Sequence, residues 1–416
     1  MKTFQNIALA TFCFMVLSIY GAKAQSDTKI NWKEDLEIYK SLLEQKHINL
    51  YHAVAKEVFT NEWEEIYGNI NSLEDLDVIT KLMRLTRRIH DGHTSISLSN
   101  VSWHQFPFEI KNIEGKWRVV KTLKAYEHLL YASLESINNI PIQQVAKQIS
   151  EVAQFVENKY SLKERTGSYL TTAELLFNLN IIDDLQTANF NFLDKNNKKM
   201  SLPLHTVEKE YWYKQPNLSE VVLQVSQIKK PIDRRSDLWY APILETNALY
   251  INFKSYPTFE VMQRIGEQLV GYIQEHNIKQ VIIDMRENGG GDLYVGTVLA
   301  YALNLADSID WEHGVYVLTS NHTFSAATSN AALFKQLLNA KIVGQPTGSN
   351  PNGYQDMDTF TLPNSKLVVT YSKRLFRLSE IQNTALIPDI FINQSEADLL
   401  LGKDTVLATL INKIKN

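Results

Sequence analysis

Cysteine is nearly absent from this sequence. Among 416 residues there is one, Cys13, and it lies in an apolar segment at the N-terminus. That segment has the pattern of an export signal, because Lys2 precedes the apolar run and the small-x-small triplet AKA at residues 22–24 forms a cleavage site. We therefore interpret residues 1–24 as a signal peptide and expect an exported protein, periplasmic or extracellular. An uncleaved anchor helix is the alternative.

The mature chain would lack cysteine, long apolar segments and an excess of basic residues, and each absence excludes a structural or functional feature. Without cysteine it has no disulfide, cysteine nucleophile or thiolate metal site. No later stretch approaches the roughly 20 apolar residues that span a bilayer, so no membrane span is expected after cleavage. Removing Lys2 and Lys23 from 42 basic residues leaves 40 against 46 acidic ones, a net charge of -6. Nucleic acid is therefore not an expected partner, because binding it requires clustered Lys and Arg.

The spacing of apolar residues divides the rest of the chain into three parts. Up to residue 100 apolar residues recur at steps of three and four, which predicts an N-terminal helical segment over residues 25–100. Residues 101–210 mix short strands and helices and predict a smaller α+β domain. Residues 236–416 alternate apolar strands with amphipathic helices, which predicts an α/β core with parallel strand pairing.

A glycine-rich turn follows one predicted core strand. The stretch IIDMRENGGGD, residues 282–292, runs from the strand into three consecutive glycines. Without a Cβ, glycine lets backbone N–H groups approach a ligand, and such a turn can direct donors at a developing oxyanion. Gly289 and Gly290 are therefore candidate oxyanion-hole residues. A tight turn without a ligand is the alternative, and the spacing is not that of a dinucleotide-binding loop.

Two histidines stand three residues apart in IHDGHTS, residues 89–95. A metal pair would need further ligands at suitable spacing, and the sequence offers none. A buried structural histidine is the plain alternative. Because an imidazole titrates near neutral pH, His93 is a candidate general base.

A serine stands where a predicted strand leads into a predicted helix. In LTSNHTFSAATSN, residues 318–330, Ser325 follows the strand by a short loop and precedes a helix beginning near Ala326. Free N–H groups and the positive end of the helix dipole would lie beside the hydroxyl. Ser325 is therefore a candidate nucleophile, with the Ala326 N–H as an oxyanion donor. A helix N-cap is the alternative.

Together these stretches resemble the tail-specific, or C-terminal processing, serine peptidases, which have a Clp protease/crotonase-like core of stacked β-α units. DGHTS (91–95), IIDMRENGGGD and TFSAAT (323–328) are similar to the histidine, oxyanion and nucleophile motifs of that family. IPDIFI (387–392) with GKDTVLATLI (402–411) resembles its C-terminal signature. In the middle domain, LESINNIPIQQV (134–145) loosely resembles a PDZ-type module.

The resemblance also bears on the third catalytic group. Members with a serine–lysine dyad carry a lysine in a loop that reads GQPTGSNPNGYQ here (344–355) and has none. His93 therefore implies the tricorn-like serine–histidine arrangement, in which a glutamate shortly before the PDI signature orients the histidine. Gln382 stands at that position and Glu380 two residues earlier. Glu380 would supply a carboxylate, whereas Gln382 would accept the Nδ1–H bond as a neutral amide.

The expected function is that of an exported serine peptidase acting on a peptide or protein. Ser325 would be the nucleophile and His93 the general base, with no metal or organic cofactor implied. Two alternatives remain: a catalytically impaired member that binds a peptide or other ligand, which Gln382 favours, and a hydrolase of small esters. The sequence does not indicate the oligomeric state.

Overall fold

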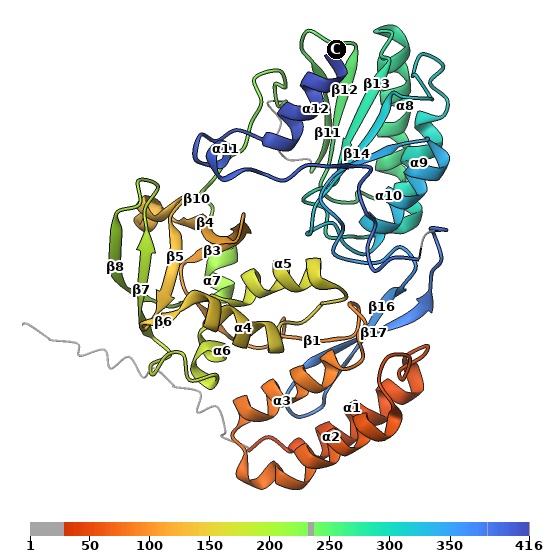
Figure 1. Ribbon diagram of the computed structural model, residues 1–416. Helices are drawn as coiled ribbons and strands as arrows, with labels where there is room; N and C mark the ends of the chain where they lie inside the picture. The colour runs from red at the N-terminus through yellow and green to blue at the C-terminus, as the bar shows by residue number, and fades with distance from the viewer. Residues whose placement is uncertain (1–28, 232–236, 381, 416) are drawn as a thin grey trace, which may run out of the picture.

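The computed structural model describes residues 29–231, 237–380 and 382–415. The predicted signal peptide lies outside the described residues. Figure 1 shows three parts in succession: N-terminal helices, a mixed α+β domain and an α/β core that carries the C-terminus. The predicted α/β class with an N-terminal helical segment is confirmed. Within the described ranges, no helix combines the length and apolar character needed to cross a bilayer.

The N-terminal helices pack through one apolar face each. In the first helix the Asn31 side chain accepts the Glu34 N–H and starts the helix, and apolar residues at three- and four-residue steps follow. Four of these, Trp32, Leu36, Tyr39 and Leu43, are buried. The helices are α1 (Trp32–Lys46), α2 (Lys56–Asn69) and α3 (Asp75–Arg87), followed by the short strand β1 (Ser95–Ser97).

The middle domain is built on a seven-stranded sheet whose main path runs β10-β4-β5-β7-β8, with β3 paired to β4 and β6 to β5. Its core holds the aromatic rings of Phe106, Phe108, Phe190 and Phe192, several in edge-to-face contact. The sheet extends beyond residue 210, because β10 pairs with β4. The elements are β2 (His104–Gln105), β3 (Phe108–Ile113), β4 (Lys116–Leu123), β5 (Ser133–Ile137), β6 (Ile140–Pro141), α4 (Ile142–Val152), α5 (Lys159–Tyr169), α6 (Ala173–Asn178), β7 (Thr187–Leu193), β8 (Lys199–His205), β9 (Val207–Glu208), α7 (Lys209–Lys214) and β10 (Leu218–Glu220).

The C-terminal core is a six-stranded sheet in the order β11-β12-β13-β14-β15-β18. All neighbouring strands are parallel except β11, which is antiparallel to β12. Helices α8, α9 and α10 cover one face and α12 the other (Figure 1), as predicted for stacked β-α units. The elements are β11 (Leu238–Ile243), β12 (Ala248–Phe253), α8 (Phe259–Glu275), β13 (Gln280–Asp284), α9 (Leu293–Leu303), β14 (Val315–Thr319), α10 (Ala326–Leu337), β15 (Lys341–Gly344), β18 (Ile390–Phe391), α11 (Glu396–Leu400) and α12 (Thr405–Lys415).

A hairpin leaves this core and joins the N-terminal half. It consists of β16 (Tyr354–Thr361) and β17 (Val368–Leu375), and β17 pairs antiparallel with β1. Leu367 and Val369 are buried in the same apolar cluster as the N-terminal helices and the middle sheet. The pairing places the segment just before β1, which contains His93, beside the loops at the carboxyl ends of β13, β14 and β15.

Candidate active site

Ser325 has a strained backbone and a free hydroxyl. It lies between β14 and α10 with φ +55° and ψ -130°, a region that non-glycine residues rarely occupy. Ser325 occupies the N-cap position of α10, but its side chain makes no capping hydrogen bond to the helix. Its N–H donates to Ser349 Oγ at 2.8 Å. Strain of this kind marks functional positions, and it resembles the exposed serine of a nucleophile elbow.

The glycine turn lies directly against this serine. Gly290 has φ +111°, and a Cβ built on it would lie 2.7 Å from Ser325 Cβ and 3.3 Å from its Oγ. The Gly290 N–H donates to Asn288 Oδ1 at 2.9 Å, while Asn288 Nδ2 donates to the Phe253 carbonyl. Asn288 therefore fixes the turn, and the absence of a side chain at Gly290 permits the close approach to Ser325.

Two further backbone groups at this place suit an anion. Ala326 is the first residue of α10, where an N–H has no acceptor within the helix. Gly289 is exposed at the other side of the turn, and a Cβ built on it would lie 3.6 Å from His322 Nε2. The structure thus brings together all three residues predicted for the oxyanion hole, although the Gly290 N–H is already bonded to Asn288.

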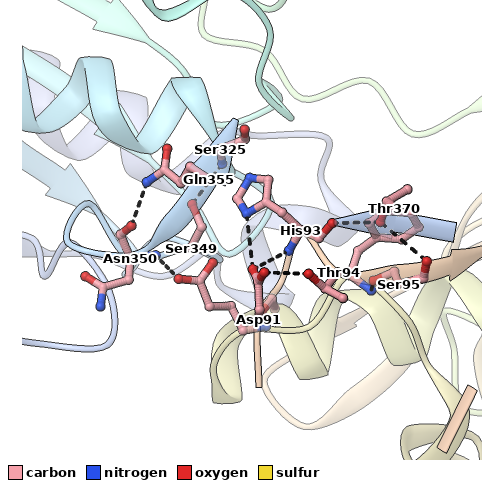
Figure 2. A network of polar contacts seen from close by, with 12 residues as sticks. Asp91, His93, Thr94, Ser95, Ser325, Ser349, Asn350, Gln355 and Thr370 are labelled. Atoms are coloured by element: carbon pink, nitrogen blue, oxygen red, sulfur yellow. Dashed lines mark hydrogen bonds and ion pairs between the residues drawn. The ribbon is translucent and has the colours of Figure 1, made fainter. Parts of the chain in front are cut away.

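His93 lies beside the serine and is 2% exposed. Its ring packs on Phe324, the residue before Ser325, with 5.1 Å between ring centroids. Figure 2 shows the imidazole between Ser325 and Asp91. Neither ring nitrogen has a hydrogen-bond partner among the described residues. Burial lowers the pKa of His93 against the opposing charge of Asp91, so the imidazole is neutral near pH 7 and available as a base.

Asp91 is the carboxylate nearest to the His93 ring, and the sequence reasoning did not single it out. Its Oδ1 lies 3.8 Å from His93 Nδ1 and accepts the His93 backbone N–H at 2.9 Å. Its Oδ2 accepts from His47 Nε2 at 3.0 Å and from the Thr94 hydroxyl at 2.6 Å. Burial acts to raise the pKa of Asp91, but the His47 bond and the neighbouring His93 hold it below its usual value. Its position two residues before His93 is the signal that could have identified it.

The two side chains predicted to orient His93 lie elsewhere. Glu380 and Gln382 are both exposed, and neither shares a hydrogen bond or ion pair with His93 among the described residues. Ile381, which separates them, lies outside the described residues. The structure therefore does not bring this pair to the imidazole, and their role stays a prediction.

A second buried carboxyl borders the site. Glu157 Oε1 accepts the Asn350 N–H at 3.1 Å, and its Oε2 is buried without a partner among the described residues. Burial, together with the charge of Asp91, raises the pKa of Glu157 well above its usual value. Of the two buried carboxyls, Glu157 is thus the one that holds its proton more strongly, whereas the lowered pKa of Asp91 favours its ionised form next to His93.

Helix α5 of the middle domain docks on the segment that carries Ser325. Asn158, which caps α5, donates to the Thr347 and Thr384 carbonyls at 3.3 and 2.7 Å. One turn further, Glu164 lies 3.1 Å from His322 Nδ1. Burial acts to raise the pKa of Glu164, but the His322 bond and nearby cations lower it to about 2. The middle domain thus supplies charged side chains to the approach of the site.

Solved structures share this architecture. Mature CPAF superposes with a TM-score of 0.67 and 12% identity, over 92% of this chain and 96% of that chain. CPAF complexed with lactacystin gives 0.66 and 11%, over 92% and 97%. The photosystem II D1 C-terminal processing protease gives 0.40 and 10%, over 86% and 92%. In sequence, no protein-family model and no curated protein matches the chain. The chain therefore shares the fold of mature CPAF.

Proposed function

We propose that this chain is an exported serine peptidase. The observation that carries the proposal is Ser325, strained, uncapped and in contact with the glycine turn, beside a neutral His93 whose ring nitrogens are unpartnered. The fold supports the same reaction class. Export is supported by the sequence pattern of residues 1–24.

The geometry suits a two-step acyl transfer. Ser325 Oγ attacks the scissile carbonyl carbon while His93 takes the hydroxyl proton, and the same proton then passes to the leaving amine. The N–H groups of Ala326 and Gly289 stabilise the tetrahedral oxyanion, and Gly290 leaves room for it. Water then repeats the sequence on the acyl-enzyme and releases the second product.

Asp91 takes the part of the third catalytic group in this proposal. It is the ionised carboxylate at His93 Nδ1, and a ring rotation that closes the 3.8 Å separation makes the hydrogen bond. Three other hydrogen bonds already fix its position. A carboxylate here stabilises the imidazolium that forms as Ser325 loses its proton.

The alternative of an impaired, ligand-binding member rests on one observation. The His93 ring nitrogens have no hydrogen-bond partner among the described residues, and neither Glu380 nor Gln382 forms a hydrogen bond or ion pair with the ring. A hydrolase of small esters would use the same residues as a peptidase. Turnover of a matched amide and ester pair separates these readings, because an esterase cleaves only the ester and a binding protein neither.

Labelling with a fluorophosphonate probe tests the proposed function. An activated serine attacks phosphorus, so the mature protein is expected to gain one adduct, located on Ser325 by peptide mass spectrometry. Ser349 and Ser329 lie nearby with hydrogen-bonded hydroxyls and serve as internal controls. Heat-denatured protein should not react. Absence of an adduct on the folded protein, or an adduct on another serine, would contradict the proposal.

Replacing Gly290 with alanine is expected to lower kcat about 100-fold, because correct placement of nucleophile and oxyanion donors contributes at least that much. The new methyl group would lie 2.7 Å from Ser325 Cβ, and φ at this position is +111°. Gly271→Ala is the matched control: it lies in α8 with nothing within 4 Å of its built Cβ. Steady-state kinetics of both variants, with melting temperatures, measure the effect. Wild-type kcat in Gly290→Ala would show that the turn does not contact the reacting atoms.

A further inference from the structure

An arginine without a hydrogen-bond acceptor among the described residues lies over the ring of the residue that precedes the candidate nucleophile. Arg165 is on α5, and its guanidinium carbon lies 5.2 Å from the ring centroid of Phe324, the residue before Ser325. The side chain is half-buried. Within residues 29–231, 237–380 and 382–415, no oxygen accepts a hydrogen bond from it and no carboxylate forms an ion pair with it, and Tyr169 and Glu164 act on it only through their charge.

The other arginines of the described chain behave differently. Those that are buried or half-buried all have acceptors, while Arg264 and Arg377 are exposed to water. Arg87 donates to the carbonyls of Ser150 and Ala153, Arg118 to the Tyr131 carbonyl and Glu396, and Arg286 to Asp284 and Asp404. A cation that loses hydration without gaining an acceptor is unfavourable, so Arg165 stands out as a group whose partner comes from elsewhere.

Neighbouring carboxylates do not supply a hydrogen-bonded partner. Glu164, next to it on α5, favours the positive charge of Arg165 from a distance but forms its ion pair with His322. Asp91 is held by His47, Thr94 and the His93 backbone. We therefore expect a bound ligand to supply the hydrogen-bond acceptor for the Arg165 guanidinium.

The position of Arg165 relates that ligand to the reacting groups. Phe324 contacts both the Arg165 guanidinium and the His93 ring. The charge of Arg165 also acts on the His93 imidazole, where it opposes protonation. A group bound to the guanidinium would thus lie near Phe324, whose ring also packs on His93.

We infer that Arg165 binds a carboxylate of the substrate close to the cleaved bond. A guanidinium presents parallel N–H donors that match a carboxylate, and its contact with an aromatic ring fixes its orientation. The carboxylate belongs to an Asp or Glu side chain of the substrate. This inference rests on the proposed peptidase function and narrows its substrates to peptides with an anionic group near the scissile bond.

Matched peptides test the inference. One pair carries Glu or Gln beside the cleaved bond, and both members have an amidated C-terminus. We expect the wild type to prefer the Glu peptide by about 10- to 100-fold in kcat/KM, the range for hydrogen bonds to charged groups. A second pair, with a free or amidated C-terminus and no acidic side chain, is the control and should show no preference that depends on Arg165.

Three variants complete the experiment. Arg165→Gln is expected to reduce the ratio of kcat/KM between the anionic and neutral peptides to about 1. Arg165→Lys keeps the positive charge but loses the two parallel N–H donors, so it is expected to retain part of this ratio. Arg264→Gln, an exposed arginine, is the matched control and should keep the full ratio. An unchanged ratio in Arg165→Gln, or no preference in a wild type that forms the Ser325 adduct, would overturn the inference alone. A wild type without that adduct would overturn the proposed function instead.

Discussion

Ser325→Ala is expected to lower kcat by about 10⁴- to 10⁶-fold, with a melting temperature close to that of the wild type. Without the hydroxyl no acyl-enzyme forms, and only the oxyanion donors and substrate binding continue to assist the attack of water. Alanine keeps the Cβ and with it the strain of φ +55°, so the fold is neither relieved nor disrupted. Progress curves with a cleaved peptide, compared at equal protein concentration, measure the loss.

Ser325→Gly separates chemistry from strain at the same position. Glycine adopts positive φ without a steric cost, so this variant is expected to be as inactive as Ser325→Ala but more stable by about 1 kcal/mol. Chemical denaturation of both variants measures the difference. Equal stability of the two would mean that the positive φ carries no strain, and residual turnover near the wild-type rate would rule out Ser325 as nucleophile.

Asp91→Asn is expected to lower kcat about 1,000-fold while KM changes little. The amide preserves the shape of the carboxylate but cannot stabilise the imidazolium, which forms only during the reaction. The charge of Asp91 also raises the pKa of His93. Its removal therefore lowers that pKa, and the acid limb of the kcat/KM profile moves to lower pH as the plateau falls.

The shift of the pH profile distinguishes catalysis from structural damage. The charged groups around His93 are Asp91 and Arg165. Asp91 in turn contacts His47 and lies near Glu157, whose pKa is raised by burial and by the charge of Asp91. A loss of packing would lower the plateau of the kcat/KM profile without moving its acid limb to another pH. The variant Glu380→Gln is measured under the same conditions as Asp91→Asn. A greater loss of kcat in Glu380→Gln than in Asp91→Asn would assign the orienting role to Glu380.

The α/β core was predictable from sequence because its signals are local. Strand and helix alternate with clear periods from β12 to α10, and the carboxyl ends of parallel strands meet at one edge. The glycine turn after β13 and Ser325 after β14 were therefore expected at adjacent places. Their closeness in the structure, 2.7 Å between Ser325 Cβ and a built Gly290 Cβ, follows from this order.

The contacts that complete the site could not be predicted in this way. Arg165 lies in a polar helix, where one basic residue resembles any solvent-facing side chain. Its place beside Phe324 depends on the docking of α5, and the place of Asp91 depends on β1 pairing with β17. Both arrangements join segments more than 150 residues apart, and no local period or turn residue encodes them.

The pairing of β1 with β17 has a consequence for when the protein can react. His93 belongs to a segment packed into the N-terminal and middle core, whereas Ser325 starts a helix of the C-terminal core. Under the proposed function, neither half alone contains both the nucleophile and the base. A nascent or partly unfolded chain would then be inactive, and hydrolysis of neighbouring proteins, or of other copies of itself, would begin only after the two halves have joined.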